Sequence, residues 1–266
     1  MRFSIITINL NNKSGLVTTI ESVMSQKNCE IEYIIIDGNS SDNSQEVIKT
    51  YQRQISKWVS EEDGGIFNAM NKGLSFATGD FVLFLNSGDY FKHSNVIDQA
   101  SLLISSTLPA IYYGLVEELG KSSIKIKDIG PNLDIMTLFR RGLPHQAVFY
   151  PRSVYTSKKY NEKYKIAGDR MYNLELYASG YRFHYLPFII TTCTMGGISS
   201  KADSRKFGSI EYCAALENSE LRNVYNDLSK FNTIQWHQTE LKRLLKEQRD
   251  INWRLKLYDF LRRKMS

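Results

Sequence analysis

Apolar runs that stop at polar residues fill the first third of the chain, and they constrain its fold more than any other feature. The runs lie at about residues 2–8, 31–36, 57–60 and 81–85. Between them, residues 14–26, 43–55 and 65–77 have the spacing of amphipathic helices, and Ser14 suits the N-cap of the first helix. Strands that alternate with helices in this way predict βαβ units around a mainly parallel sheet.

Polar side chains follow these runs at the points where the chain leaves the predicted strands. Asn9, Asp37, Asp63 and Asp89 stand at these positions. Ligands of open α/β sheets bind beyond the carboxyl ends of the strands, so we expect these four residues along one rim. Asp89 directly follows a buried strand and suits a hard divalent cation that bridges two phosphates, although Asn86-Ser87-Gly88-Asp89 is also an ordinary turn sequence.

The second half of the chain has a different pattern, and we divide the chain into residues 1–205 and a helical, basic extension over 206–266. A hairpin, two strands and an intervening helix are predicted at about 111–118 with 123–127, at 147–150 and 182–190, and at 169–179.

Five segments, taken in order, resemble family 2 glycosyltransferases, in particular those that build bacterial surface polysaccharides of the colanic-acid type. They are Ser4-Ile5-Ile6-Thr7-Ile8-Asn9, Ile34-Ile35-Ile36-Asp37-Gly38-Asn39-Ser40-Ser41-Asp42, Glu62-Asp63-Gly64-Gly65-Ile66-Phe67-Asn68-Ala69-Met70-Asn71-Lys72-Gly73, Ala77-Thr78-Gly79-Asp80 and Leu85-Asn86-Ser87-Gly88-Asp89. The resemblance covers about residues 1–200. It implies a GT-A fold, which is α/β and Rossmann-like with a mainly parallel central sheet, and an inverting transfer from a nucleotide diphosphate-sugar to an acceptor hydroxyl.

The resemblance also assigns residues to the donor. These are Asn9, Asp37, Asp63, Asn68, Lys72, Asn86 and His145. It places Asp37 on the base or ribose, where a carboxylate accepts hydrogen bonds from an imide N–H or a hydroxyl, and it brings Lys72 to phosphate charge. Structural alternatives stay open: Asp37-Gly38 is a common turn, and a lone helical lysine is usually a solvated surface group. For His145 four roles stay open: it binds the metal, the diphosphate or the acceptor, or it only forms a hydrogen-bonded corner before a strand.

The metal ligand and the catalytic base follow from the same resemblance. Asp89 corresponds to the direct ligand of Mn²⁺ or Mg²⁺, although Gly88 stands where the family usually has a second acid. Asp169, at the start of a predicted helix, corresponds to the base that deprotonates the acceptor hydroxyl. An acid in the first turn of a helix is also a common capping residue.

The charge of the chain is concentrated at its carboxyl end. Residues 236–266 carry nine Lys/Arg and four Asp/Glu, a net charge of +5, out of +6 for the whole chain. Leucines and aromatic residues lie between these charges, so the segment suits either the anionic inner face of a membrane or packing on the protein core or a partner chain, as in a homo-oligomer. Gly196 and Gly197, in a stretch that resembles the end of the transferase core, suit a turn or a close approach to phosphate.

Several classes of protein are disfavoured by the composition. Cys29, Cys193 and Cys213 are odd in number and far apart, which predicts ordinary thiols. No long apolar span, signal peptide or nucleic-acid motif is present, so we expect a cytoplasmic protein that does not act on nucleic acid. The resemblance to surface-polysaccharide transferases implies a lipid-linked glycan as the acceptor. The preferred reaction moves a hexose or N-acetylhexosamine, from UDP in particular. The alternatives are a non-catalytic nucleotide-sugar binding module and a dinucleotide-dependent oxidoreductase, and the latter lacks its Gly-x-Gly-x-x-Gly motif.

Overall fold

The computed structural model describes residues 1–105, 110–194, 202–217, 221–223 and 226. By its internal contacts the chain divides into Met1–Ala215 and Leu216–Ser266, and the elements below belong almost wholly to the first unit. The predicted boundary at residue 205 lies inside helix α8 (Ala202–Glu217) and stays a prediction. Gly196, Gly197 and the predicted basic segment 236–266 lie outside the described residues.

The first half of the unit alternates strands and helices. Its elements are β1 (Arg2–Asn9), α1 (Lys13–Met24), β2 (Glu30–Asp37), α2 (Ser44–Thr50), β3 (Lys57–Ser60), α3 (Ile66–Phe76), β4 (Phe81–Phe84), β5 (Tyr90–Phe91) and α4 (Val96–Leu103). The second half contains β6 (Ile111–Leu119), β7 (Ile124–Lys127), α5 (Ile135–Arg141), the 3₁₀ turn η1 (His145–Ala147), β8 (Val148–Pro151), α6 (Arg152–Tyr155), α7 (Gly168–Ala178), β9 (Phe183–Thr194) and α8.

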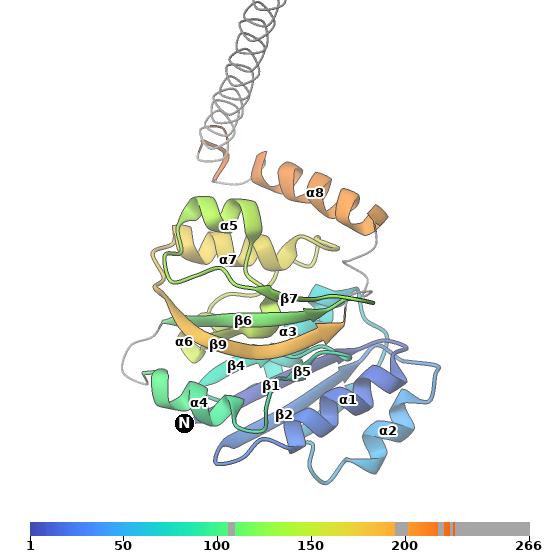
Figure 1. Cartoon of the computed structure of the whole chain (residues 1–266). Coiled ribbons are helices and arrows are strands. Elements are labelled where there is room, and N and C mark those ends of the chain that lie inside the picture. Colours follow the sequence, from blue (N-terminus) through green and yellow to red (C-terminus); the bar gives the residue numbers. More distant parts are fainter. Residues whose placement is uncertain (106–109, 195–201, 218–220, 224–225, 227–266) are drawn as a thin grey trace, which may run out of the picture. The chain divides into compact units, whose positions relative to one another are not determined.

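One sheet runs through this unit in the order β3-β2-β1-β4-β8-β6-β9-β5, with β7 paired to β6 (Figure 1). The strands β3, β2, β1 and β4 are parallel, whereas β8 is antiparallel to both β4 and β6. The carboxyl ends of β1 to β4 therefore lie at one edge, which we call the rim. Because β8 runs antiparallel to β4, the 3₁₀ turn η1 that precedes β8 lies at the same rim.

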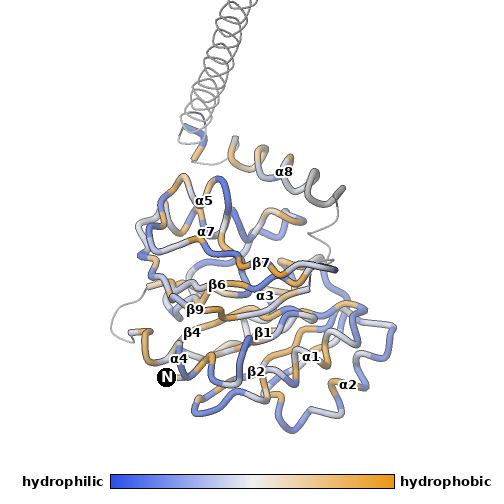
Figure 2. The backbone as a smooth tube through the Cα atoms, in the orientation of Figure 1, coloured by the Kyte–Doolittle hydropathy of each residue, from blue (hydrophilic) through white to orange (hydrophobic). Residues whose placement is uncertain are grey.

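The sheet is covered on both faces, because the alternating side chains of a strand point to opposite sides. Phe3 and Ile5 of β1 pack in the same buried cluster as Leu16 and Ile20 of α1. Helix α3 covers the other face, against β1 and β2 (Figure 1). Figure 2 shows apolar colour along the central strands and mixed colour along α1 and α2, as expected for strands buried on both faces and helices buried on one.

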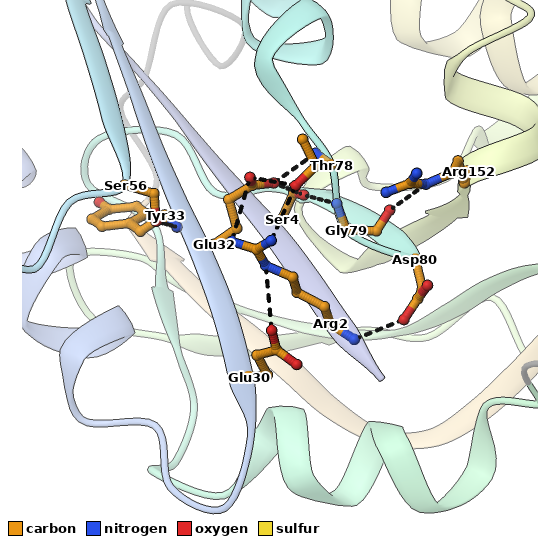
Figure 3. A network of polar contacts seen from close by, with 10 residues as sticks. All are labelled: Arg2, Ser4, Glu30, Glu32, Tyr33, Ser56, Thr78, Gly79, Asp80 and Arg152. Carbon is orange, nitrogen blue, oxygen red and sulfur yellow. Dashed lines mark hydrogen bonds and ion pairs between the residues drawn. The ribbon is translucent and has the colours of Figure 1, made fainter.

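A polar network at the opposite ends of these strands secures their register (Figure 3). The buried carboxylate of Glu32 accepts hydrogen bonds from the Ser4 hydroxyl and from the backbone N–H and hydroxyl of Thr78. Burial alone would raise the pKa of Glu32, but these donors outweigh it and hold the pKa below its ordinary value. Arg2 extends the network to Asp80, since its backbone N–H donates to that carboxylate over 2.8 Å. The network ties β1, β2 and the start of β4 together, far along the strands from the rim.

The predicted α/β class and mainly parallel sheet are confirmed. Two local predictions need correction. The N-cap of α1 is Asn12, whose side chain accepts from Gly15 N, and not Ser14, because the helix already begins at Lys13. The second predicted helix ends at Thr50 and not near residue 55, since Tyr51 leaves the helical backbone conformation.

Candidate active site

Asn9 and Asp37 are neighbours at the rim, as expected, since they face each other in the parallel register of β1 and β2. Asp37 is fully buried and its carboxylate accepts from Asn9 Nδ2 at 2.7 Å, from Ser60 Oγ at 2.6 Å and from the backbone N–H and hydroxyl of Ser40. The protein itself thus supplies four donors. Asp37 organises the loop that follows β2, and its predicted contact with the nucleotide stays a prediction.

Asp63 and Lys72 form an ion pair beside this loop. The Lys72 ammonium lies 2.6 Å from Asp63 Oδ1 and 2.8 Å from Glu61 Oε1. Burial would lower the pKa of Lys72, but the two carboxylates raise it above its ordinary value. Lys72 is therefore charged and already engaged by two acids of the same chain. A donor phosphate would have to compete with them for it.

Asn68 and Asn71 project from α3 onto Glu162, a residue that the sequence patterns did not single out. Their side-chain amides donate to the two oxygens of the Glu162 carboxylate, each over 2.8 Å. Asn71 also exchanges hydrogen bonds with the backbone of Tyr160. These contacts fasten α3 to the segment that leads into α7.

The loop that carries Asp89 is held by α1. Thr19 of α1 accepts a hydrogen bond from Gly88 N at 2.9 Å, and its hydroxyl lies 2.7 Å from the carbonyl oxygen of Asp89. Gly88 has φ +102, a conformation that side-chain-bearing residues rarely adopt. The glycine that replaces the second acid of the family pattern is thus the residue that this turn requires.

Asn86, His145 and Asp169 meet at the rim beside Asp89, although the sequence separates them widely. Asn86 Nδ2 lies 3.1 Å from His145 Nε2, and His145 Nδ1 lies 3.4 Å from Asp169 Oδ2. His145 sits in the turn before β8, and Asp169 lies in the first turn of α7. We call these four residues the Asp89–Asp169 cluster. It brings the predicted metal ligand and the predicted base into one site.

The electrostatics of the cluster follow from its burial. Burial raises the pKa of Asp89 to about 6, and the nearby charge of His145 works in the opposite direction. Burial likewise disfavours the charged form of His145, but Asp169 and Asp89 outweigh it and raise its pKa. Cys193 is close enough to Asp89 to respond to it: burial first, and then that charge, raise the pKa of this thiol to about 11. Cys193 is thus a poor nucleophile, and all three cysteines are free, as expected.

The cluster fits a divalent cation. Burial raises the pKa of the Asp89 carboxylate, so a bound cation would stabilise its charged form. Asn86 Oδ1 is buried without a hydrogen-bond partner. Among the described residues, no three His, Cys, Asp or Glu side chains form a complete metal site. Mg²⁺ and similar ions are commonly held by one or two carboxylates together with substrate phosphates, so Asp89 is a suitable single acid for that arrangement.

Comparison with known proteins identifies the family. The family model described as glycosyl transferase family 2 matches residues 4–178, which include Asp89, His145 and Asp169. The chain belongs to this family. Membership confirms the resemblance seen in the sequence and excludes the oxidoreductase alternative.

Two bacterial relatives illustrate how far the similarity extends. An uncharacterized glycosyltransferase of Mycobacterium tuberculosis is 33% identical over 179 residues, which cover 64% of this chain and 67% of the relative. A PGL/p-HBAD biosynthesis glycosyltransferase of Mycobacterium bovis is 26% identical over 213 residues, or 77% of this chain and 82% of the relative.

Solved structures confirm the GT-A fold of this glycosyltransferase. Residues 1–349 of Staphylococcus aureus TarS, in complex with UDP-GlcNAc, match with a TM-score of 0.65 and 18% identity over 85% of this chain and 70% of that one. The chain spans only 42% of the longer TarS structure. The mannosyltransferase PcManGT of Pyrobaculum calidifontis, in complex with GDP-Man and Mn²⁺, matches with a TM-score of 0.61 and 14% identity over 82% of this chain and 65% of that one.

Proposed function

We propose that this glycosyltransferase is an inverting, metal-dependent enzyme that moves a hexose or N-acetylhexosamine from a UDP-sugar to an acceptor hydroxyl. The observation that carries the proposal is the Asp89–Asp169 cluster, in which a half-buried acid suited to a cation lies in one site with a second acid next to an imidazole. Inversion by a single displacement requires a base on the acceptor side and charge stabilisation on the leaving-group side. The cluster offers a residue for each.

The division of work follows from where each residue lies. Asp169, partly exposed in the first turn of α7, takes the proton of the acceptor hydroxyl, and His145 orients its carboxylate. Asp89, together with the free oxygen of Asn86, would hold Mn²⁺ or Mg²⁺. When bound, that cation neutralises the charge that develops on the diphosphate.

The nucleoside belongs, in this proposal, at the other end of the rim. Asn9, Asp37 and Asp63 lie there, with Asn68 and Lys72 on the neighbouring helix α3. Gly38 lies against Asp63, because a methyl group at residue 38 would come 3.1 Å from Asp63 Oδ2. A nucleobase that enters beside Gly38 would contact Asp63 first and would weaken the ion pair between Asp63 and Lys72.

The choice of UDP rests on likeness to TarS structures that hold UDP-GlcNAc and UDP, whereas the PcManGT structure holds GDP-Man. Thermal unfolding with UDP, GDP or dTDP, each with Mn²⁺ or Mg²⁺, tests it. At one common nucleotide concentration we expect UDP with Mn²⁺ to stabilise the protein most, and by about 2.7 kcal/mol where that concentration is 100 times the UDP dissociation constant. A larger shift with GDP or dTDP would refute the UDP assignment. Binding without any release of sugar from UDP-sugars would instead support the non-catalytic module.

The acceptor and the cellular role are further parts of the proposal. We assign a lipid-linked glycan of surface polysaccharide synthesis as the acceptor, on the resemblance carried by the five sequence segments. The Mycobacterium bovis relative is named for PGL/p-HBAD biosynthesis. None of the described helices has both the length and the apolar character needed to cross a membrane. Contact with the inner face of a membrane would then come from residues 236–266, with their net charge of +5.

Deletion of residues 236–266 is expected to lower sedimentation with anionic vesicles while hydrolysis of a soluble UDP-sugar continues. Basic residues near an anionic surface each contribute about 1 kcal/mol, and salt screens them, so binding of the full chain should weaken as ionic strength rises. If the full chain ignores anionic vesicles at low salt, or the shortened chain unfolds, the segment packs on the core or forms a homo-oligomer.

A further inference from the structure

A carboxylate outside the matched family region binds the chain immediately before α7. Glu211 of α8 accepts three consecutive backbone hydrogen bonds, from Lys165 N at 2.6 Å, Ile166 N at 2.8 Å and Ala167 N at 2.7 Å. Hydrogen bonds from backbone N–H groups to an ionised carboxylate are roughly twice as strong as neutral ones. Glu211 therefore fixes the path of the backbone that enters α7.

This carboxylate lies beside the start of a helix that has no side-chain cap at its N-cap residue. The N-cap of α7 is Ala167, whose side chain makes no capping hydrogen bond. A negative charge beside the first turn also suits the dipole of the helix. Asp169 lies two residues after Ala167, so the position of its carboxylate depends directly on what holds residues 165–167.

Two more residues of α8, Tyr212 and Gly208, contact this region or α5. Gly208 lies three residues before Glu211 and four before Tyr212, so it shares a side of the helix with each of them. The Tyr212 ring lies 4.0 Å from the Arg170 guanidinium carbon, and its hydroxyl donates to the carbonyl oxygen of Phe139 at 3.3 Å. Gly208 allows the close approach, because a methyl group there would lie 2.8 Å from Ile166 Cγ2. Figure 1 shows α8 beside α5 and α7.

We propose that Glu211 is a positioning residue for the catalytic base, and that α8 is part of the catalytic unit. The inference rests on the proposed role of Asp169. Glu211 holds residues 165–167 and through them keeps Asp169 at its 3.4 Å contact with His145. A misplacement of about 1 Å at a reacting group can reduce the rate about 100-fold. Within the part of the chain that the structure describes, the side-chain hydrogen bonds of Glu211 go to residues 165–167 and not to the donor half of the rim.

The test is Glu211→Ala in the full chain, with hydrolysis of UDP-N-acetylglucosamine and Mn²⁺ as the assay. We expect kcat to fall by about 10- to 100-fold, with KM and the dissociation constant of UDP within about twofold of wild type. Glu211→Gln keeps an acceptor oxygen but loses the charge, so its kcat should lie between those of wild type and Glu211→Ala. Gly208→Ala pushes α8 from Ile166 and should lower kcat in the same selective way.

Hydrogen exchange supplies a readout that is independent of activity. Glu211→Ala should accelerate exchange of the amides of residues 165–167 and leave those of β2 unchanged, because the lost acceptor is local. Ile210→Ala, on an exposed neighbour in α8, should change neither exchange nor kcat. If Glu211→Ala does not fold, Gly208→Ala decides by the same two measurements.

The outcomes separate this inference from the proposed function. Full kcat in Glu211→Ala despite faster exchange, or an equal loss of UDP affinity, would overturn the positioning role. If Asp169→Asn retains full turnover, Asp169 is not the base and both proposals are wrong. If Asp169→Asn loses turnover but Glu211→Ala and Gly208→Ala keep it, the inference on α8 alone is wrong.

Discussion

Asp169→Asn is expected to lower glycosyl transfer by about 10²- to 10⁴-fold, the usual contribution of a general base, while UDP and metal affinities stay within about twofold. The amide has the shape of the carboxylate and can remain beside His145, but it cannot take the proton of the acceptor. Turnover and UDP binding should be measured on the same preparation, because only their ratio distinguishes loss of a base from loss of the fold.

Glu175→Gln is the matched control for this variant. Glu175 is another acid of α7 and pairs with Lys158 at 2.9 Å, away from the Asp89–Asp169 cluster. The Glu175→Gln variant should have the turnover of wild type. An equal fall in UDP affinity and turnover in Asp169→Asn would place Asp169 in the donor site instead, and unchanged turnover would remove its catalytic role.

Asp89→Ala should reduce Mn²⁺-dependent UDP binding by at least about 100-fold, since loss of an outer-shell partner alone costs metal sites about 10- to 100-fold. The fold should survive, because Asp89 lies at the rim and not in the core. Asp98→Ala, in the first turn of α4, is a control that should bind UDP normally. Undiminished Mn²⁺-dependent binding in Asp89→Ala would show that Asp89 is not the ligand.

Stability measurements on Asp89→Asn test the same site without any ligand. Burial raises the folded-state pKa of Asp89 to about 6. Above that pH the charged carboxylate destabilises the folded state. The destabilisation decreases as the pH falls from 6 toward the ordinary pKa of an aspartate. In EDTA, Asp89→Asn should therefore be more stable than wild type at pH 8, by about 1–3 kcal/mol, and nearly equal at pH 4. A variant that is less stable than wild type at pH 8 would contradict the raised pKa of Asp89.

The sequence predicted where the ends of the parallel strands lie, for a physical reason. Asn9 and Asp37 each end an apolar run, and parallel strands bring such ends to one edge. The meeting of Asp89 with His145 and Asp169 was implied only by family resemblance. It depends on β8 pairing antiparallel with β4, a contact between distant segments that no local pattern encodes.

Other contacts could not be predicted, because the residues that make them leave no sequence pattern. The sequence indicated Lys72 as a phosphate-binding residue, but two acids in the loop after β3 form ion pairs with it. Glu162 and Glu211 are ordinary surface acids by sequence, since their partners are side-chain amides and backbone N–H groups far along the chain. Such contacts need the fold before they can be seen. The roles of Asn9, Asp37, Asn68 and Lys72 toward a donor stay predictions.

The central claim, that the chain is an inverting nucleotide-sugar transferase, is tested most directly by the configuration of the sugar it releases. Proton NMR during the first turnovers of UDP-N-acetylglucosamine with Mn²⁺, where water replaces the acceptor, reports the anomer before it equilibrates. The donor is the α-anomer, so attack from the face opposite the diphosphate predicts that β-N-acetylglucosamine forms first. Release of the α-anomer first, or no release of sugar from any UDP-hexose or UDP-N-acetylhexosamine, would contradict the claim.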